Sequence, residues 1–354
     1  MVRFSDIIKL KDKKGSKVAS PKKGVEKDKF RLSDSLVFKP QETEKGSVDI
    51  SPQESGTFSD ASLEVVTYYE KFIERASEIQ ERVKGDMGIS PSPILSDLHQ
   101  IIDKGLIDEI YEYAMSARDD YEEMLIHTIE VTFTSLKIGR GMNYDTKMLL
   151  RLGLAAFLEN VGMYKIPSSI LKRSGELQEE EIRLIKKHPE ISYEILGRMG
   201  ARYEWLAKVA LQIHERANGS GYPSGLKGEE ISDLAAIIGL VDTYVAMIKK
   251  RPYREKFIQT NAIKSIVEAS KGLFPPRIVK IFLTQISLFP VNTYVRLNNK
   301  SIGRVVSTDK DQPLRPTIEL LYDGLGNKLM ERQIIQLSNN PLLYIAKIPL
   351  FRSG

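Results

Sequence analysis

Two stretches in the second half of the chain decide the fold. Residues 214–231 are HERANGSGYPSGLKGEEI, and residues 240–254 are LVDTYVAMIKKRPYR. The first stretch places a glycine-rich loop directly after His214, and the second places Asp242 inside an apolar helix. An acidic side chain in such a helix is rarely buried without a partner. We therefore expect helices on both sides of the loop and a polar partner for Asp242.

The hydrophobic pattern around these stretches is helical from about Leu106 to Leu288. Apolar residues recur at steps of three and four, and clusters of Pro and Gly separate the segments. No alternation of strands with helices appears, so dinucleotide-binding and P-loop α/β folds are not supported. The predicted helices span residues 122–139, 146–158, 178–188, 191–199, 203–215, 233–249, 260–271 and 276–285.

Changes in composition and period divide the chain into four parts. Residues 1–59 are rich in Lys, Ser, Glu and Pro, which predicts a disordered basic tail. Residues 60–118 form an N-terminal helical region that begins with an amphipathic helix at 61–84. Residues 119–289 form the main helical domain. After Pro290 the apolar residues alternate, so residues 290–354 are predicted to be a small β-rich C-terminal extension, with a hairpin signal at Asp323–Gly324. The fold class is therefore mainly α.

Composition and charge exclude several classes of function. The 354-residue chain has no cysteine, which rules out disulfides, thiolate zinc sites and a cysteine nucleophile. Its net charge of +5 lies in the tail, where residues 1–46 carry 13 Lys and Arg against 7 Asp and Glu. The rest of the chain is close to neutral, so we expect no nucleic-acid binding. There is no signal peptide and no apolar stretch long enough to span a membrane, which predicts a cytoplasmic protein.

The histidines and carboxylates suggest metal chemistry. Glu123 and His127 are four residues apart in one predicted helix and share a face. His188 precedes a proline, and His214 precedes the glycine-rich loop. Imidazoles and carboxylates that converge from several helices can hold metal ions, which clamp a phosphodiester and activate water. The alternative is that these histidines are ordinary core or surface residues and that Asp242 caps a neighbouring helix.

The quoted stretches resemble the HD-GYP family, which comprises helical metallo-phosphodiesterases that act on the bacterial messenger cyclic di-GMP. The resemblance covers about residues 122–306 and implies an HD-domain-like helical bundle. It also implies nucleotide-binding roles for Gly221, Tyr222, Pro223, Arg251 and Arg254. The other matching segments are HTIEV (127–131), LGLAAFLENVGMYKIPSSILKRSGEL (152–177), KKHPEISYEIL (186–196), FPPRIVKIFL (274–283) and FPVNTYVRLNNKSIGRVV (289–306).

The chain departs from the family's His-Asp-x-Gly-Lys signature. In the family, the histidine binds metal, the aspartate bridges two metals, and the lysine assists at the phosphate. These positions are Glu159, Asn160 and Met163 here, Ile213 replaces the first of two adjacent histidines, and Val245 replaces a second aspartate. The metal-ligand positions that the resemblance retains are Glu123, His127, His188, His214 and Asp242.

A neutral asparagine is a poor bridge between two divalent cations, so a two-metal clamp is not expected. A residual site at His188, His214 and Asp242 fits one divalent metal, and we favour iron or manganese over zinc; the same residues are equally compatible with no metal. Glu159 could also bind a metal through oxygen.

Three hypotheses follow. The first is a degenerate HD-GYP domain without phosphodiesterase activity, which senses cyclic di-GMP or docks a partner protein. The second is an active phosphodiesterase with a remodelled metal site that includes Glu159 and Asn160. The third is a structural protein without nucleotide affinity, in which the 61–84 helix pairs two subunits or holds a protein partner.

Overall fold

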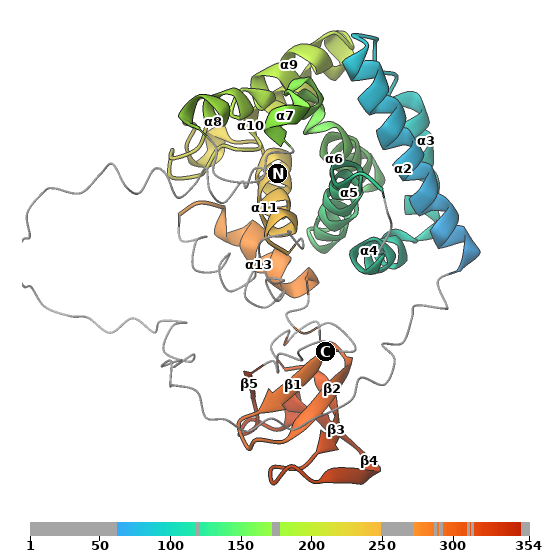
Figure 1. Ribbon diagram of the computed structural model, residues 1–354, viewed down its shortest axis with the longest axis vertical. Coiled ribbons are helices and arrows are strands. Elements are labelled where there is room, and N and C mark those ends of the chain that lie inside the picture. Colours follow the sequence, from blue (N-terminus) through green and yellow to red (C-terminus); the bar gives the residue numbers. More distant parts are fainter. Residues whose placement is uncertain are drawn as a thin grey trace, which may run out of the picture.

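A computed structural model describes residues 62–117, 121–171, 178–248, 272–286, 289, 293–309, 312 and 315–347. Helices gather into one bundle and strands form a separate small sheet (Figure 1). The longer helices are α2 (Leu63–Lys84), α3 (Ser92–Lys104), α4 (Ile107–Ser116), α5 (Glu123–Gly141), α6 (Thr146–Leu158), α9 (His188–Gly197), α10 (Glu204–Gln212), α11 (Asp233–Ile248) and α13 (Pro276–Gln285). The short ones are η2 (Val161–Lys165), α7 (Ser168–Leu171), α8 (Glu179–Ile185), η3 (Ala201–Tyr203) and η4 (Gly228–Glu230). Within the described ranges, no helix combines the length and the apolar character needed to cross a membrane.

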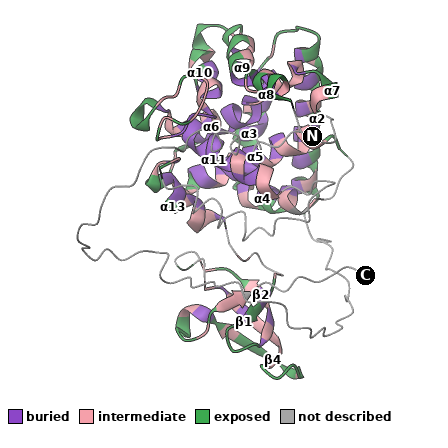
Figure 2. Ribbon diagram, turned by 60° about the vertical axis from the view of Figure 1, so that its left-hand side comes forward, coloured by how far each residue is buried: buried purple, intermediate pink, exposed green. Residues whose placement is uncertain are grey.

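The bundle has a continuous hydrophobic core that runs from Val65 in α2 to Ile286 after α13. Helices α5, α6 and α11 are buried over most of their surface (Figure 2). Helix α11 is apolar on all sides except at a few positions, which explains why it occupies the centre. The mainly helical prediction is confirmed, and polar groups on α5 and α11 face the interior of the protein.

Helix α2 confirms the predicted N-terminal amphipathic helix. It begins after Ser62, whose hydroxyl accepts a hydrogen bond from the Val65 amide, and ends at Gly85. Its apolar face is already buried inside the chain, where Phe72 packs edge-on against Phe133 and Phe157. Pairing of subunits through this helix stays a prediction, and the outward face of α2 offers mainly charged side chains for it.

The helix boundary near His188 differs from the sequence prediction, and α10 ends at Gln212, three residues before its predicted end. We expected His188 to end a helix and the next helix to begin at Ile191, but α9 begins at His188 itself. Pro189 explains the difference, because the first turn of a helix does not need the missing amide hydrogen of proline. The predicted tail (1–59), the predicted 260–271 helix, Arg251 and Arg254 lie outside the described residues.

The C-terminal part is an antiparallel sheet, as predicted. Its strand order is β4-β3-β2-β1-β5. The predicted hairpin at Asp323 joins β3 to β4, and the Asp323 carboxylate accepts hydrogen bonds from the amides of Leu325 and Asn327. The strands are β1 (Tyr294–Leu297), β2 (Ile302–Ser307), β3 (Thr317–Tyr322), β4 (Lys328–Gln336) and β5 (Ile345–Lys347), with the short helix η5 (Leu337–Asn339) before β5.

The close approach of α11 to the end of α10 yields a stability prediction. A Cβ atom at Gly239 would lie 2.1 Å from the Ile213 carbonyl oxygen. Gly239→Ala should therefore lower the free energy of unfolding by about 1–3 kcal/mol, measured by urea denaturation. Gly197→Ala is the matched control, because a Cβ there meets nothing within 4 Å. Equal stability of Gly239→Ala and the wild type would contradict this packing.

Candidate functional site

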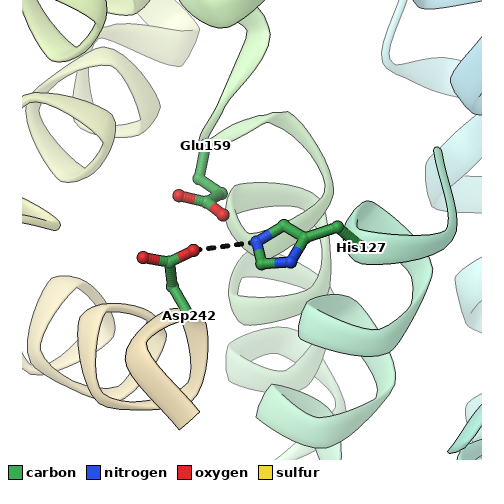
Figure 3. A group of neighbouring side chains, drawn as sticks. All are labelled: His127, Glu159 and Asp242. Atoms are coloured by element: carbon green, nitrogen blue, oxygen red, sulfur yellow. Dashed lines mark hydrogen bonds and ion pairs between the residues drawn. The ribbon is translucent and has the colours of Figure 1, made fainter. Parts of the chain in front are cut away.

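Three acidic and imidazole side chains meet inside the bundle. His127 comes from α5, Glu159 follows the last residue of α6, and Asp242 comes from α11 (Figure 3). One potential ligand atom from each lies within 4.8 Å of the others. His127 Nε2 is 2.8 Å from Asp242 Oδ1, and both carboxylates are buried, with Glu159 only 2% and Asp242 3% exposed. We call these three residues the acidic cluster.

Local packing fixes the position of Glu159. The Ser192 hydroxyl on α9 donates to the Glu159 carbonyl at 3.0 Å and accepts from the Gly162 amide at 2.9 Å. A Cβ atom at Gly162 would lie 2.2 Å from the His188 carbonyl oxygen, so only glycine allows this approach. The chain is therefore held against α9 where it leaves α6, and this contact directs Glu159 toward Asp242.

The acidic cluster is electrostatically unfavourable without a compensating charge. Burial, and then the nearby Asp242 carboxylate, raise the pKa of Glu159 well above its ordinary value of 4.5. Glu159 Oε1 accepts a hydrogen bond from Asn160 Nδ2 at 2.7 Å. Glu159 Oε2 and Asp242 Oδ2 are buried and have no hydrogen-bond partner among the described residues. An imidazole nitrogen with two carboxylates that each have a spare oxygen is a donor set that fits a divalent cation.

His188 and His214 form a second pair. His188 Nδ1 lies 2.7 Å from the Ile185 carbonyl oxygen, so it carries the hydrogen, and His188 Nε2 lies 2.8 Å from His214 Nε2. Burial lowers the pKa of His188 to about 4 and that of His214 well below its ordinary value of 6.5. Both rings are therefore neutral at pH 7, which is the form of imidazole that binds metal.

The predicted ligand set thus falls into separate groups. His127 and Asp242 share the acidic cluster with Glu159, whereas His188 and His214 contact each other. Glu123 lies one turn before His127 on α5 and is not a member of the cluster. The two groups are nevertheless close enough for an electrostatic effect, because the charge of Asp242 opposes the fall in the pKa of His188.

Three of the positions at which the chain departs from the pattern of the family it resembles hold apolar side chains. Ile213 and Val245 are buried in the main core, at 1% and 0% exposure. Met163 packs against a small apolar cluster of Ile166, Ile182 and Ile185. These side chains cannot coordinate a metal, so the structure offers no ligand at positions 213 and 245.

The Gly-Tyr-Pro loop is anchored by Glu215, a residue that the sequence did not single out. Its buried carboxylate accepts hydrogen bonds from the backbone amides of Ser224, Gly225 and Leu226, at 2.6, 3.1 and 3.0 Å. In the sequence, the only sign of this contact is that the residue between His214 and Arg216 is acidic. This residue lies nine positions before Ser224, the first loop residue whose amide it accepts. Charge-assisted bonds of this kind hold a loop firmly.

The predicted nucleotide-binding residues Gly221 and Tyr222 pack inward. A Cβ atom at Gly221 would lie 2.4 Å from Glu215 Cα. The Tyr222 ring stacks on His214, with 5.0 Å between centroids and 24° between planes, and Lys186 Nζ is 5.5 Å from the Tyr222 centroid. Pro223 follows in the same half-buried loop.

Comparisons with known proteins show which families and proteins this chain resembles. Residues 112–278 match the family model described as "HD domain", and residues 294–350 match "KOW domain associated with HD domain". Over 63% of its length the chain is 27% identical to a cyclic di-GMP phosphodiesterase of Pseudomonas aeruginosa. It is 30% identical, also over 63%, to the cyclic di-GMP phosphodiesterase PdeB of Borreliella burgdorferi.

The chain spans 53% and 59% of the length of these two relatives. Among solved structures, Bd1817, an HDG"Y"P protein from Bdellovibrio bacteriovorus, has a similar fold with a TM-score of 0.52 and 17% identity. The match covers 65% of this chain and 73% of that one. At this identity the likeness concerns the fold, and it agrees with the helical bundle described above.

The acidic cluster predicts an unusual pH dependence. In metal-free protein, Glu159 keeps its proton in the folded state but loses it near pH 4.5 when unfolded, so stability should fall as pH rises above that value. Glu159→Gln removes this fall, and in EDTA at pH 8 the variant should be more stable than the wild type by more than about 1 kcal/mol. Mn²⁺ should reverse the order by stabilising only the wild type.

Thermal and urea unfolding with EDTA or Mn²⁺ test both statements. Glu123→Gln serves as the matched control, because Glu123 is on the same helix as His127 and outside the cluster. If Glu123→Gln abolished the response to Mn²⁺ and Glu159→Gln did not, the cluster would not be the metal site.

Proposed function

This chain belongs to the HD-GYP family, and from that premise we propose that its HD domain binds a cyclic dinucleotide without hydrolysing it, acting as a nucleotide sensor or a protein-interaction module. The observation that carries this proposal is Asn160, at the position of the metal-bridging aspartate. Its neutral amide donates a hydrogen bond to Glu159 Oε1, so it supplies neither the negative charge nor the second carboxylate oxygen with which an aspartate bridges two cations.

The surrounding positions support the same conclusion. A second cation would need ligands at positions 213 and 245, where Ile213 and Val245 are buried among apolar side chains. Hydrolysis by two metals requires one cation at the attacking oxygen and one at the leaving oxygen. One remaining cation can hold a phosphate oxygen, but it does not provide both contacts.

His127, Glu159 and Asp242 are the residues that would hold a single divalent cation. Such a cation would offset the two carboxylate charges and attract an anionic ligand. The mixture of one nitrogen and two oxygen ligands suits iron or manganese. His188 and His214 lie in the vicinity as a neutral pair, and their role in the proposal is to support the Tyr222 ring.

Cyclic di-GMP is the first ligand to test, because the relatives named above carry that substrate in their names. The anchored Gly-Tyr-Pro loop supports ligand binding, since Glu215 keeps the loop in one conformation and limits the entropy lost on binding.

A specific observation favours a second candidate function, an active phosphodiesterase with a remodelled site. The spare oxygens of Glu159 and Asp242 fit a cation, and a cation-bound water can be a nucleophile. In that case purified, metal-loaded protein would hydrolyse cyclic di-GMP, and His127→Ala would abolish the activity. A third possibility, a structural role through α2, would show as no binding of cyclic di-GMP at all.

The decisive experiment measures metal content, binding and hydrolysis on one preparation. We expect the Mn²⁺- or Fe²⁺-loaded wild type to bind about one metal and to bind cyclic di-GMP, measured by elemental analysis and calorimetry, with no turnover detected by chromatography. The combined variant Glu159→His, Asn160→Asp, Ile213→His, Val245→Asp should bind about two metals and gain hydrolysis, because it restores the missing ligands.

Asn160→Ala is the matched control, because it removes the amide without adding a ligand, and it should gain no activity. Circular dichroism checks that each variant is folded. Turnover of cyclic di-GMP by the wild type would overturn the proposal in favour of the remodelled enzyme.

A further inference from the structure

The small C-terminal sheet exposes more large apolar side chains than its size explains. Its buried core holds five residues, whereas the helical bundle is rich in buried side chains (Figure 2). Among the described residues, six of the ten large apolar side chains that are exposed belong to the sheet and its loops. They are Tyr294, Leu325, Met330, Ile334, Leu342 and Tyr344. Exposed apolar groups that lie together mark an interaction surface, so their positions relative to one another matter.

The turn between β1 and β2 holds two of these side chains in place. Asn298 Nδ2 donates to the Leu342 carbonyl at 2.9 Å, and Asn298 Oδ1 accepts from the Tyr344 amide at 3.1 Å. Arg315 supports the same loop before β5, because its guanidinium donates to the carbonyls of Leu337 at 3.0 Å and Pro341 at 3.3 Å. Leu342 is nevertheless 86% exposed and Tyr344 55%. The backbone of this loop is thus fixed while its apolar side chains face solvent.

The β3–β4 hairpin brings a third apolar side chain to the same turn. A Cβ atom at Gly324 would lie 2.5 Å from the Asn299 carbonyl oxygen, so the hairpin touches the turn next to Asn298. Leu325 follows Gly324 and is 90% exposed. The Asp323 carboxylate accepts from the Leu325 amide at 2.9 Å, which fixes the hairpin backbone. We call the side chains of Leu325, Leu342 and Tyr344 the apolar tip.

Exposed basic residues border the apolar tip. They are Arg296 on β1, Lys300 in the β1–β2 turn and Lys328 at the start of β4. Asp323 is the acidic residue of the hairpin, and the amides of its own turn occupy its carboxylate. The tip therefore combines apolar groups with an excess of positive charge, which is complementary to an anionic surface.

This combination fits the surface of a lipid bilayer. Leucine side chains enter the boundary between headgroups and acyl chains, tyrosine favours the level of the headgroups, and lysine is attracted to anionic headgroups. The apolar side chains stand on loops and are almost fully exposed, so a protein partner would need cavities that match them, whereas a fluid lipid surface adapts to their shape. A nucleic acid is a poorer match, because its backbone offers charge and no apolar surface.

We propose that the apolar tip docks the protein reversibly on an anionic lipid surface. Leu325 and Leu342 enter the boundary of the bilayer, and Lys300 and Lys328 contact its headgroups. The sequence provides a second source of attraction, because residues 1–46 carry 13 Lys and Arg against 7 Asp and Glu. None of the residues of the proposed function takes part, so lipid docking and cyclic dinucleotide binding can each fail alone.

Co-sedimentation of the full chain with vesicles tests the proposal. The vesicles contain phosphatidylglycerol and phosphatidylcholine in equal parts. The wild type should bind, and the double variant Leu325→Ser, Leu342→Ser should lower the partition coefficient about tenfold or more, because two apolar side chains no longer leave water. Leu63→Ser is the matched control, since Leu63 is an 83% exposed leucine on α2, and it should change binding less than about twofold. Circular dichroism checks that the variants are folded.

Charge and depth of insertion are measured separately. Lys300→Gln, Lys328→Gln should weaken binding to the anionic vesicles about fivefold or more and should leave binding to pure phosphatidylcholine unchanged. A variant with Leu325→Trp and Trp205→Phe has its one tryptophan at the tip. Its fluorescence should shift to shorter wavelength on the vesicles and be quenched by brominated lipid.

Three results would overturn the proposal and leave the proposed function intact. The first is a wild type that does not bind the anionic vesicles. The second is equal binding by the wild type and by Leu325→Ser, Leu342→Ser, which would assign binding to the basic residues 1–46. The third is a dimer in analytical ultracentrifugation that dissociates in this double variant while no tryptophan shift occurs on vesicles, which would assign the tip to a second copy of the chain.

Discussion

The proximity of two buried carboxylates, Glu159 and Asp242, is the constraint on which the rest of the site depends. Two such groups cannot both be charged at low cost in a dry interior. Each carboxylate has one hydrogen-bond contact: Asn160 donates to Glu159, and the His127 ring contacts Asp242. One oxygen of each carboxylate stays unsatisfied among the described residues, and the pKa of Glu159 rises. A proton or a cation must therefore complete the charge balance.

The two histidines beside the Gly-Tyr-Pro loop carry no charge at pH 7. His188 and His214 are kept neutral by burial, and they join the α8–α9 junction to the Gly-Tyr-Pro loop through ring and hydrogen-bond contacts. Glu215 fixes the other side of that loop through three backbone amides. The loop geometry is thus set by neutral rings on one side and by a carboxylate acting as an acceptor on the other, without any metal being required for its shape.

Hydrophobic periodicity was sufficient to predict the helices, because α5, α6 and α11 each bury a regular pattern of side chains. It failed at His188, where Pro189 starts a helix instead of ending one. The hairpin signal at Asp323 implied β4, but periodicity gave no bounds for this strand, because its residues are mostly exposed on both faces and show no alternation. In the site, helical spacing singled out His127 and an apolar helix singled out Asp242, but Glu215 acts through tertiary contacts that no local pattern encodes. The sequence marked Glu159 as a substitution that could bind a metal but did not place it beside Asp242, because the turn that carries it there depends on Ser192 and Gly162.

The substitutions differ in what they do to stability, and this difference bears on function. Replacing buried polar groups by apolar ones of similar size is often neutral or stabilising, so Ile213 and Val245 need no functional explanation. The Glu159–Asp242 contact is the opposite case, because it costs stability in the absence of a cation and contributes no packing that an apolar pair would not. An interaction that is unfavourable for folding and lies beside an anchored ligand loop is best explained by a ligand that makes it favourable. The chain therefore combines positions that are filled by hydrophobic core with a cluster of His127, Glu159 and Asp242 whose donor atoms fit a cation.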